Sequence, residues 1–208
     1  MINVKKIKEI QSLLHDETIV AATKYVGCND IIELLGVGIN NIGENRVDAF
    51  LKKYEELNSY PIIWHFIGTL QTNKVSDMIN KIDYLHSLDN LRLAEKINRY
   101  RNTPLKCFIE VNVTKEDTKH GIYVENLEEF LHNLEKYDKI EVVGLMTMAP
   151  NTLDIKTIDD CFSQLKALKK KYNLPYLSMG MSNDYEVAIK NGTSFLRLGR
   201  ILFEGEDK

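Results

Sequence analysis

Short apolar runs alternate with amphipathic stretches along nearly the whole chain, and this alternation restricts the fold more than any other feature. A helix is predicted at about residues 2–15, and strand-like runs with helical patterns between them follow it. Such regular alternation is typical of parallel strands joined by crossover helices. The predicted strands are residues 18–23, 41–43, 62–66, 84–88, 105–113, 140–145, 176–177 and 194–198.

Strand–helix units of this number and size favour a closed barrel. Eight of them in about 190 residues fit a small (β/α)8 barrel, and an open doubly wound sheet is the rival arrangement. Several of the predicted strands are very short, so the pattern alone leaves that rival open. We therefore predict the α/β class, with a single TIM-type (β/α)8 barrel domain over residues 1–208 and an extra N-terminal helix.

Several helix ends are also predicted from the residues that cap them. The clearest helical period covers residues 157–172, with Thr157 and Asp160 as a capping box at its start. Asn90 and Asn183 are expected to begin two other helices, and Gly192 is expected to end the second of these.

The composition excludes several classes of function. The chain has 27 Lys and Arg residues against 30 Asp and Glu, which gives a net charge of −3 and predicts neither a nucleic-acid nor a membrane partner. Cys28, Cys107 and Cys161 lack metal-ligand spacing, so neither a disulfide nor a metal site is expected. With no signal peptide and no run of about 20 apolar residues, we expect a soluble, cytoplasmic protein.

Lys24 is the residue that most constrains the chemistry. It follows the first predicted strand, and the carboxyl ends of barrel strands are where such folds place their active sites. There, a lysine amine can form a Schiff base with an aldehyde if burial and neighbouring groups lower its pKa. We therefore expect Lys24 to lie buried at the mouth of the barrel.

The last two strands are followed by residues suited to a phosphate. Residues 179–182 lead into a helix predicted to begin near Asp184, and Ser182 adds a hydroxyl group. Gly199 and Arg200 supply backbone donors after the eighth strand, and barrels often bind phosphate between these two loops. Taken separately, Ser182 could be only a helix cap and Gly199 only a turn, but together they favour a phosphate site.

Arg197 lies in an apolar run just before Gly199. A buried arginine stays charged and needs an acceptor, which could be a carboxylate inside the barrel. Beside Lys24 and a phosphate site, a better partner is the ring nitrogen of a phosphorylated pyridine aldehyde. These three features together describe a site for pyridoxal 5'-phosphate (PLP).

The chain resembles the pyridoxal phosphate homeostasis protein family, whose single barrel is similar to the N-terminal domain of bacterial alanine racemases. The resemblance extends through nearly the whole chain, and its longest motifs are WHFIGTLQTNK at residues 64–74 and LSMGMSND at 177–184. Shorter matching segments are VAATK at 20–24, GEN at 43–45, GLMT at 144–147 and RLG at 197–199.

The resemblance implies a role for each residue of the cofactor site. Lys24 would hold PLP as a Schiff base, Ser182 and the backbone of Gly199 and Arg200 would bind the phosphate, Arg197 would face the pyridine nitrogen, and Asn45 and Met146 would line the ring. This chain departs from the family at Arg200, where Thr or Ser is usual, and at Tyr25, where a small or polar residue is usual. The role of the Arg200 side chain therefore stays open.

Two observations favour a carrier over an enzyme. An arginine at the pyridine nitrogen disfavours its protonation and so weakens the ring as an electron sink. The chain also ends soon after the phosphate loop, which leaves no room for the second domain that alanine racemases use. No catalytic residue and no metal ligand is therefore assigned, and His65, inside an apolar run, is expected to be a packed, hydrogen-bonded histidine.

The leading hypothesis is a PLP-binding protein that stores, buffers or delivers the cofactor, without robust catalysis. Its expected partners are PLP and the PLP-dependent apoenzymes that receive it, and the chain is expected to be a monomer. A PLP-dependent amino-acid racemase of narrow or weak activity is the first alternative. A barrel aldolase that uses Lys24 on a sugar phosphate is the second.

Overall fold

The computed structural model describes residues 1–116 and 118–203, and these residues form a closed barrel. Eight parallel strands make a ring in the order β1-β2-β3-β4-β5-β7-β8-β9, which the pairing of β9 with β1 closes. The predicted barrel is confirmed, and the open sheet is excluded because β4 also pairs with β5. The strands of the ring are β1 (Thr18–Ala22), β2 (Asn41–Glu44), β3 (Ile63–Phe66), β4 (Tyr84–Leu88), β5 (Leu105–Asn112), β7 (Ile140–Met146), β8 (Tyr176–Ser178) and β9 (Phe195–Leu198).

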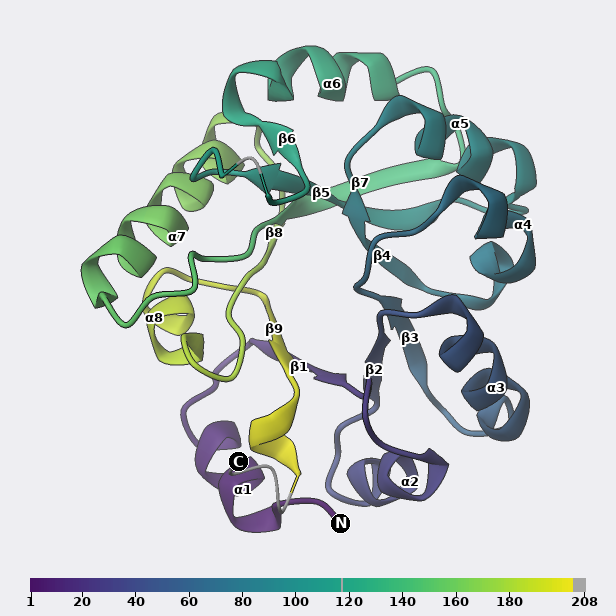
Figure 1. The fold of residues 1–208 in the computed structure, drawn as a ribbon, viewed down its shortest axis with the longest axis vertical. Helices are drawn as coiled ribbons and strands as arrows, with labels where there is room; N and C mark the ends of the chain where they lie inside the picture. The colour runs from purple at the N-terminus through teal and green to yellow at the C-terminus, as the bar shows by residue number, and fades with distance from the viewer. Residues whose placement is uncertain (117, 204–208) are drawn as a thin grey trace.

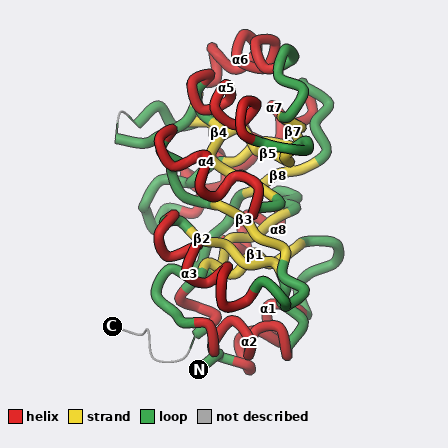
Figure 2. The backbone as a smooth tube through the Cα atoms, turned by 90° about the vertical axis from the view of Figure 1, so that its right-hand side faces the viewer, coloured by secondary structure: helices red, strands yellow, loops and turns green. Residues whose placement is uncertain are grey.

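Helices lie around the outside of this ring (Figure 1), and the side view shows the strands behind them (Figure 2). The two-residue strand β6 (Ile122–Tyr123), which the sequence did not predict, pairs with β5 outside the ring. The α-helices are α1 (Val4–Gln11), α2 (Cys28–Gly36), α3 (Val47–Leu57), α4 (Val75–Met78), α5 (Leu91–Tyr100), α6 (Leu127–Leu134), α7 (Ile155–Lys171) and α8 (Tyr185–Lys190). The short 3-10 helices are η1 (Thr72–Lys74), η2 (Ile79–Lys81), η3 (Val124–Asn126) and η4 (Arg200–Leu202).

The predicted helix ends were partly wrong. Asn90 caps α5 as predicted, because its side chain accepts a hydrogen bond from the N–H of Leu93. The start of α7 is instead capped by Asp154, whose carboxylate accepts from the N–H of Lys156 and from the hydroxyl of Thr157. Thr157 therefore lies inside the first turn.

For α8, the predicted C-terminal end is correct, but the predicted N-cap residue is not. Asp184 occupies the N-cap position at which Asn183 was expected. Gly192 follows the helix with φ of +75°, a conformation that favours glycine. The prediction that Gly192 ends this helix is confirmed.

The buried side chains form two layers of different chemistry. Between strands and helices the layer is apolar and includes Phe50, Ile97 and Phe162. Inside the ring, a smaller apolar cluster that includes Phe108 and Phe195 surrounds buried polar side chains. The outer layer thus binds helices to the barrel, while the inner layer holds polar groups beneath the mouth.

The two ends of the described chain meet beside α1. The N–H of Asn3 donates to the carbonyl of Leu202 over 2.8 Å, and Ile2 forms an antiparallel bridge with Phe203. The predicted N-terminal helix therefore exists, although it is shorter than expected, and it packs against the segment that follows β9. None of the helices in residues 1–116 and 118–203 is both long and apolar enough to span a membrane.

Candidate functional site

Lys24 lies two residues beyond the end of β1, at the mouth of the barrel. The preceding Thr23 is fully buried and fixes the backbone there, because its N–H donates to the carbonyl of Gly43 over 2.9 Å. The Lys24 side chain is exposed, and its Nζ lies 4.7 Å from the ring centroid of Tyr25. The predicted position is confirmed, but the predicted burial is wrong because the strand ends before the lysine and Tyr25 is itself 72% exposed.

A second lysine, Lys53, contacts the backbone immediately before Lys24, and nothing in the sequence indicated this contact. Lys53 of α3 is buried, and its Nζ donates to the carbonyl of Thr23 over 2.6 Å. The same Nζ lies 3.5 Å from Oε1 of Glu44, which is also buried. Burial raises the pKa of Glu44 and Lys53 opposes that shift. Lys53 thereby ties α3 to the backbone that presents Lys24.

Four of the predicted residues, which lie in β9 or in the loops after β8 and β9, line one large cavity. This cavity has a volume of about 940 Å³, and its lining includes Ser182, Arg197, Gly199 and Arg200. The Arg200 side chain is exposed, whereas Ser182 and Gly199 are half-buried. In η4, the N–H of Leu202 donates to the carbonyl of Gly199, whereas the N–H groups of Arg200 and Ile201 are at the helix start, where backbone donors can face an anion.

The conformation of the loop after β8 is set by the close packing of Gly180 against α8 and β9. Gly180 has φ of +95°, and a Cβ there would lie 2.5 Å from Cβ of Ala188 and 2.7 Å from Cδ2 of Leu196. The carboxylate of Asp184 accepts from the N–H of Met181. Gly180 is thus required for contact with α8 and β9, and the fixed loop then holds Ser182 beside the cavity.

Arg197 is buried in β9 and is held at both ends of its guanidinium. Nη1 donates to Oγ of Ser178 over 2.6 Å, and Nη2 donates to the carbonyl of Thr147 over 2.9 Å. Burial lowers its pKa to about 10, while Glu110 and Asp184 oppose that shift, so the side chain stays charged at neutral pH. No carboxylate within salt-bridge distance of Arg197 is found among the described residues.

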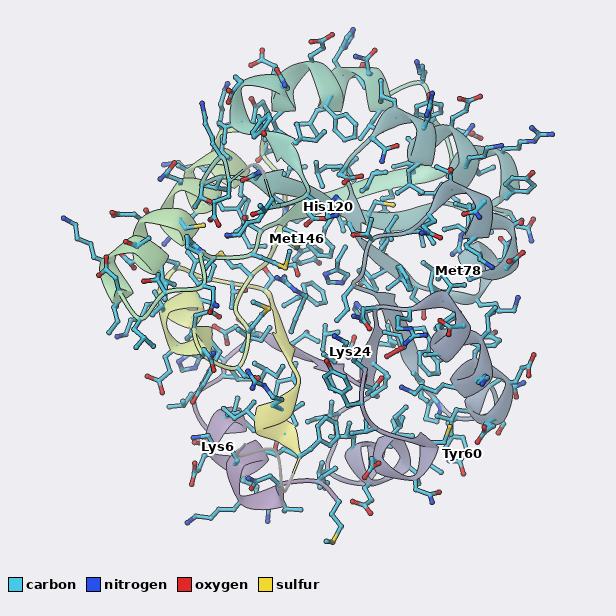
Figure 3. The ribbon with its side chains drawn as sticks, viewed as in Figure 1. Lys6, Lys24, Tyr60, Met78, His120 and Met146 are labelled. Carbon is cyan, nitrogen blue, oxygen red and sulfur yellow. The ribbon has the colours of Figure 1, made fainter. Side chains whose placement is uncertain are left out.

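Asn45 and Met146 lie outside this cavity. Met146 is buried at the end of β7, and Figure 3 shows Met146 and Lys24 over the inside of the ring. Asn45 lines a neighbouring cavity of about 500 Å³. Its Oδ1 is buried and has no hydrogen-bond partner among residues 1–116 and 118–203.

The WHFIGTLQTNK motif positions Asn45 from the adjacent strand. A Cβ on Gly68 would lie 2.2 Å from the backbone oxygen of Asn45, so only glycine allows this close approach. The carbonyl of Gly68 accepts from the hydroxyl of Ser87 over 2.6 Å. The motif therefore fixes the loop that carries Asn45.

Glu110, another residue that the sequence analysis missed, lies buried in β5 below the mouth. Burial and the charge of Asp89 raise its pKa to about 7, and Arg197 and His120 oppose the shift. A carboxyl group that titrates near neutral pH beside a charged arginine makes the electrostatics of the mouth depend on pH. No cluster of three or more metal-ligating side chains occurs among the described residues.

His65 behaves as predicted, as a packed histidine inside the ring. It is fully buried, and its two ring nitrogens lie 2.9 Å from Nε2 of His86 and 2.9 Å from Oδ1 of Asn41. Its ring stacks on Tyr84 with centroids 4.6 Å apart. Its partner His86 follows 21 residues later, and no local sequence signal pointed to that contact.

Known proteins are similar to this chain in both sequence and fold. The family model described as "Alanine racemase, N-terminal domain" matches residues 3–207. The pyridoxal phosphate homeostasis protein of Aquifex aeolicus is 42% identical over 199 residues, covering 91% of this chain and 87% of that protein. The chain belongs to the pyridoxal phosphate homeostasis protein family.

Solved structures agree with membership of the pyridoxal phosphate homeostasis protein family. PipY of Synechococcus elongatus, solved with PLP bound, superposes with a TM-score of 0.88 and 28% identity, covering 96% of this chain and 99% of that one. An alanine racemase of Clostridium difficile superposes with a TM-score of 0.75 at 16% identity, covering 99% of this chain and 58% of that one. At this low identity, the racemase shows a shared fold only.

Proposed function

We propose that this chain binds PLP at the mouth of its barrel and serves in intracellular PLP homeostasis, by storing, buffering or delivering the cofactor. The observation that supports this most is the cavity lined by Ser182, Gly199 and the anchored Arg197. Lys24 does not line it, but its neighbours Ala22 and Tyr25 do, so the lysine lies at the edge of this cavity. The PLP bound to PipY, a relative of the same fold, supports the same ligand.

The residues present fit each part of PLP. Ser182 and the N–H groups after Gly199 would hold the phosphate, since donors and a helix start favour an anion. Arg197, charged and held by Ser178 and Thr147, would face the ring nitrogen. Asn45 and Met146, the two residues expected to line the ring, do not line the cavity that would hold the phosphate.

Lys24 would hold the cofactor covalently. The Lys24 amine would provide the nitrogen of a Schiff base with the cofactor's aldehyde, with release of one water. When bound, PLP supplies an aldehyde for this bond and an electron-accepting ring. Because the Lys24 amine is exposed at the mouth, it can be reached from solvent, which suits a cofactor that must enter and leave.

We assign this site to a carrier without robust turnover. A charged Arg197 facing the ring nitrogen would disfavour protonation of that nitrogen and would so weaken carbanion stabilisation. The family's name as a homeostasis protein supports the same assignment. We also propose a single domain over residues 1–208, a monomeric and cytoplasmic protein, and PLP-dependent apoenzymes as recipients of the cofactor.

Absorbance spectroscopy with matched assays tests the proposal. The wild-type protein should take up added PLP and become yellow, and Lys24→Arg, which keeps the charge but is a poor imine former, should not develop that band. Incubation of loaded protein with single L-amino acids should yield no sustained formation of D-isomer. Turnover that depends on Lys24 would favour the racemase, and a protein that takes up no PLP would favour the aldolase.

A further inference from the structure

A row of buried polar side chains crosses the inside of the barrel and ends at Arg197. Beginning from Arg197, Nη1 lies 2.6 Å from Oγ of Ser178, and that Oγ lies 2.8 Å from Nδ1 of His86. Nε2 of His86 lies 2.9 Å from Nδ1 of His65, and Nε2 of His65 lies 2.9 Å from Oδ1 of Asn41. The proposed function uses Arg197 and its contact with Ser178, but none of His86, His65 and Asn41.

The hydrogen bonds of this row run in one direction. A guanidinium only donates, so Oγ of Ser178 accepts from Arg197 and is free to donate its own hydrogen to Nδ1 of His86. His86 then carries its hydrogen on Nε2 and donates to Nδ1 of His65. His65 in turn carries its hydrogen on Nε2 and donates to Oδ1 of Asn41.

The opposite direction leaves groups unsatisfied. His65 would then present a bare Nε2 to the Oδ1 of Asn41, and turning the Asn41 amide would break the bond from its Nδ2 to Oδ1 of Asn40. Ser178 would have to accept from both Arg197 and His86, which leaves its hydroxyl hydrogen without a partner from this row. Buried polar groups without partners are costly, so the first direction is favoured.

Both histidines are neutral in this arrangement. Each ring is fully buried, and burial lowers the pKa of His65 to about 3. Burial, together with the charge of Arg197, holds the pKa of His86 well below its usual value. Neutral rings let the charge of Arg197 remain the only positive charge in the row.

We propose that Ser178, His86, His65 and Asn41 are positioning residues for Arg197, and that their one-way hydrogen-bond relay holds the guanidinium toward the cofactor ring. Without Ser178 as acceptor, a long flexible side chain could turn toward the carboxylates of Glu110 or Asp184, whose charges it already feels. This inference rests on the proposed function for the ring nitrogen, but the direction of the relay does not.

The direction of the relay is testable in the protein without PLP. Long-range 15N–1H spectra of histidine-labelled protein report which ring nitrogen carries the hydrogen. For both His65 and His86 we expect a neutral ring protonated at Nε2 at pH 7. A ring protonated at Nδ1, or a charged ring, at either position would overturn the relay whatever the protein binds.

The effect on Arg197 is testable with PLP and matched variants. Ser178→Ala and His86→Phe break the relay, whereas Tyr84→Phe keeps the ring that stacks on His65 and removes only a phenol that accepts from Lys106 at the surface. We expect both relay variants to weaken PLP binding by about tenfold, the size of one lost hydrogen bond to a charged group. They should also shift the absorption band of bound PLP, while Tyr84→Phe changes neither.

The outcomes separate the two proposals. If wild-type protein takes up no PLP, the proposed function fails, while the histidine spectra still decide the relay. If wild-type protein binds PLP and Ser178→Ala keeps both its affinity and its absorption band, the positioning role is wrong. A variant that binds weakly but has an unchanged absorption band would show loss of packing rather than of orientation, and would also overturn the proposal.

Discussion

The two buried layers of the barrel differ in what their side chains do. In the layer between strands and helices, residues such as Phe162 and Leu165 of α7 make only apolar contacts. Inside the ring, His65, His86 and Arg197 are as deeply buried but depend on hydrogen bonds. The comparison teaches that the outer layer supplies stability through burial of apolar area, whereas the inner layer uses part of that stability to hold polar groups in place.

The largest expected effect lies in the outer layer. Phe162→Ala removes a fully buried ring and should lower the free energy of unfolding by about 3–5 kcal/mol. Urea denaturation measures this loss, and Phe162→Leu should retain most of the stability. Any Phe162 variant that still folds should keep the wild-type absorption band of bound PLP. A changed band would show that the outer layer also orients the polar groups of the inner layer.

The next effect belongs to the histidines of the inner layer. The pKa of His65 is about 3 in the folded protein against 6.5 for an ordinary histidine, so the folded state binds fewer protons between these values. Stability from this group is present above pH 6.5 and is lost as pH falls, by about 3 kcal/mol at pH 4. The free energy of unfolding, measured from pH 8 to pH 4, should therefore fall less steeply for His65→Gln than for wild type. An equal pH dependence in the two proteins would contradict a buried, neutral ring.

Glu110 should show the opposite dependence on pH. Its pKa is about 7 when folded against 4.5 when unfolded, so the folded state binds more protons between these values. Stability therefore falls as pH rises from 4.5 to 7, and Glu110→Gln should be more stable than wild type by about 3 kcal/mol at pH 8. The gain should vanish at pH 4. A loss at pH 8 would mean that Arg197 needs the carboxylate charge more than burial disfavours it.

The smallest expected effect is at the surface. Asp154→Ala removes the cap of α7 and should lower the midpoint of thermal unfolding by less than any of the changes above. Thermal unfolding measures this cost, with Thr157→Val as the comparison that keeps the carboxylate. If Thr157→Val costs more than Asp154→Ala, the cap lies where the sequence predicted it.

The sequence was sufficient for features that depend on local pattern. Strand positions such as 84–88 and the loops that carry Ser182 and Gly199 follow from apolar runs and turn residues, which act over a few positions. It was insufficient where contact depends on the closed ring. His86 and Ser178 lie 92 residues apart in the chain and meet only because β4 and β8 face each other across the barrel.

The exposure of Lys24 was misjudged for a related reason. The apolar run predicted a buried strand up to Thr23, and one residue of register decides whether the next side chain lies inside or outside. Lys53 was missed because a lysine in an amphipathic helix is usually at the surface. Here its burial is compensated because the ammonium group donates to the carbonyl of Thr23 and pairs with the carboxylate of Glu44.

Site mapping of the covalent bond tests the central claim most directly. Loaded wild-type protein would be treated with borohydride, digested, and analysed by mass spectrometry for the lysine that carries the reduced PLP adduct. We predict stoichiometric labelling at Lys24, with Lys53 and the surface lysines unlabelled at one equivalent of PLP. Labelling spread over other lysines, or absent from Lys24, would contradict the account.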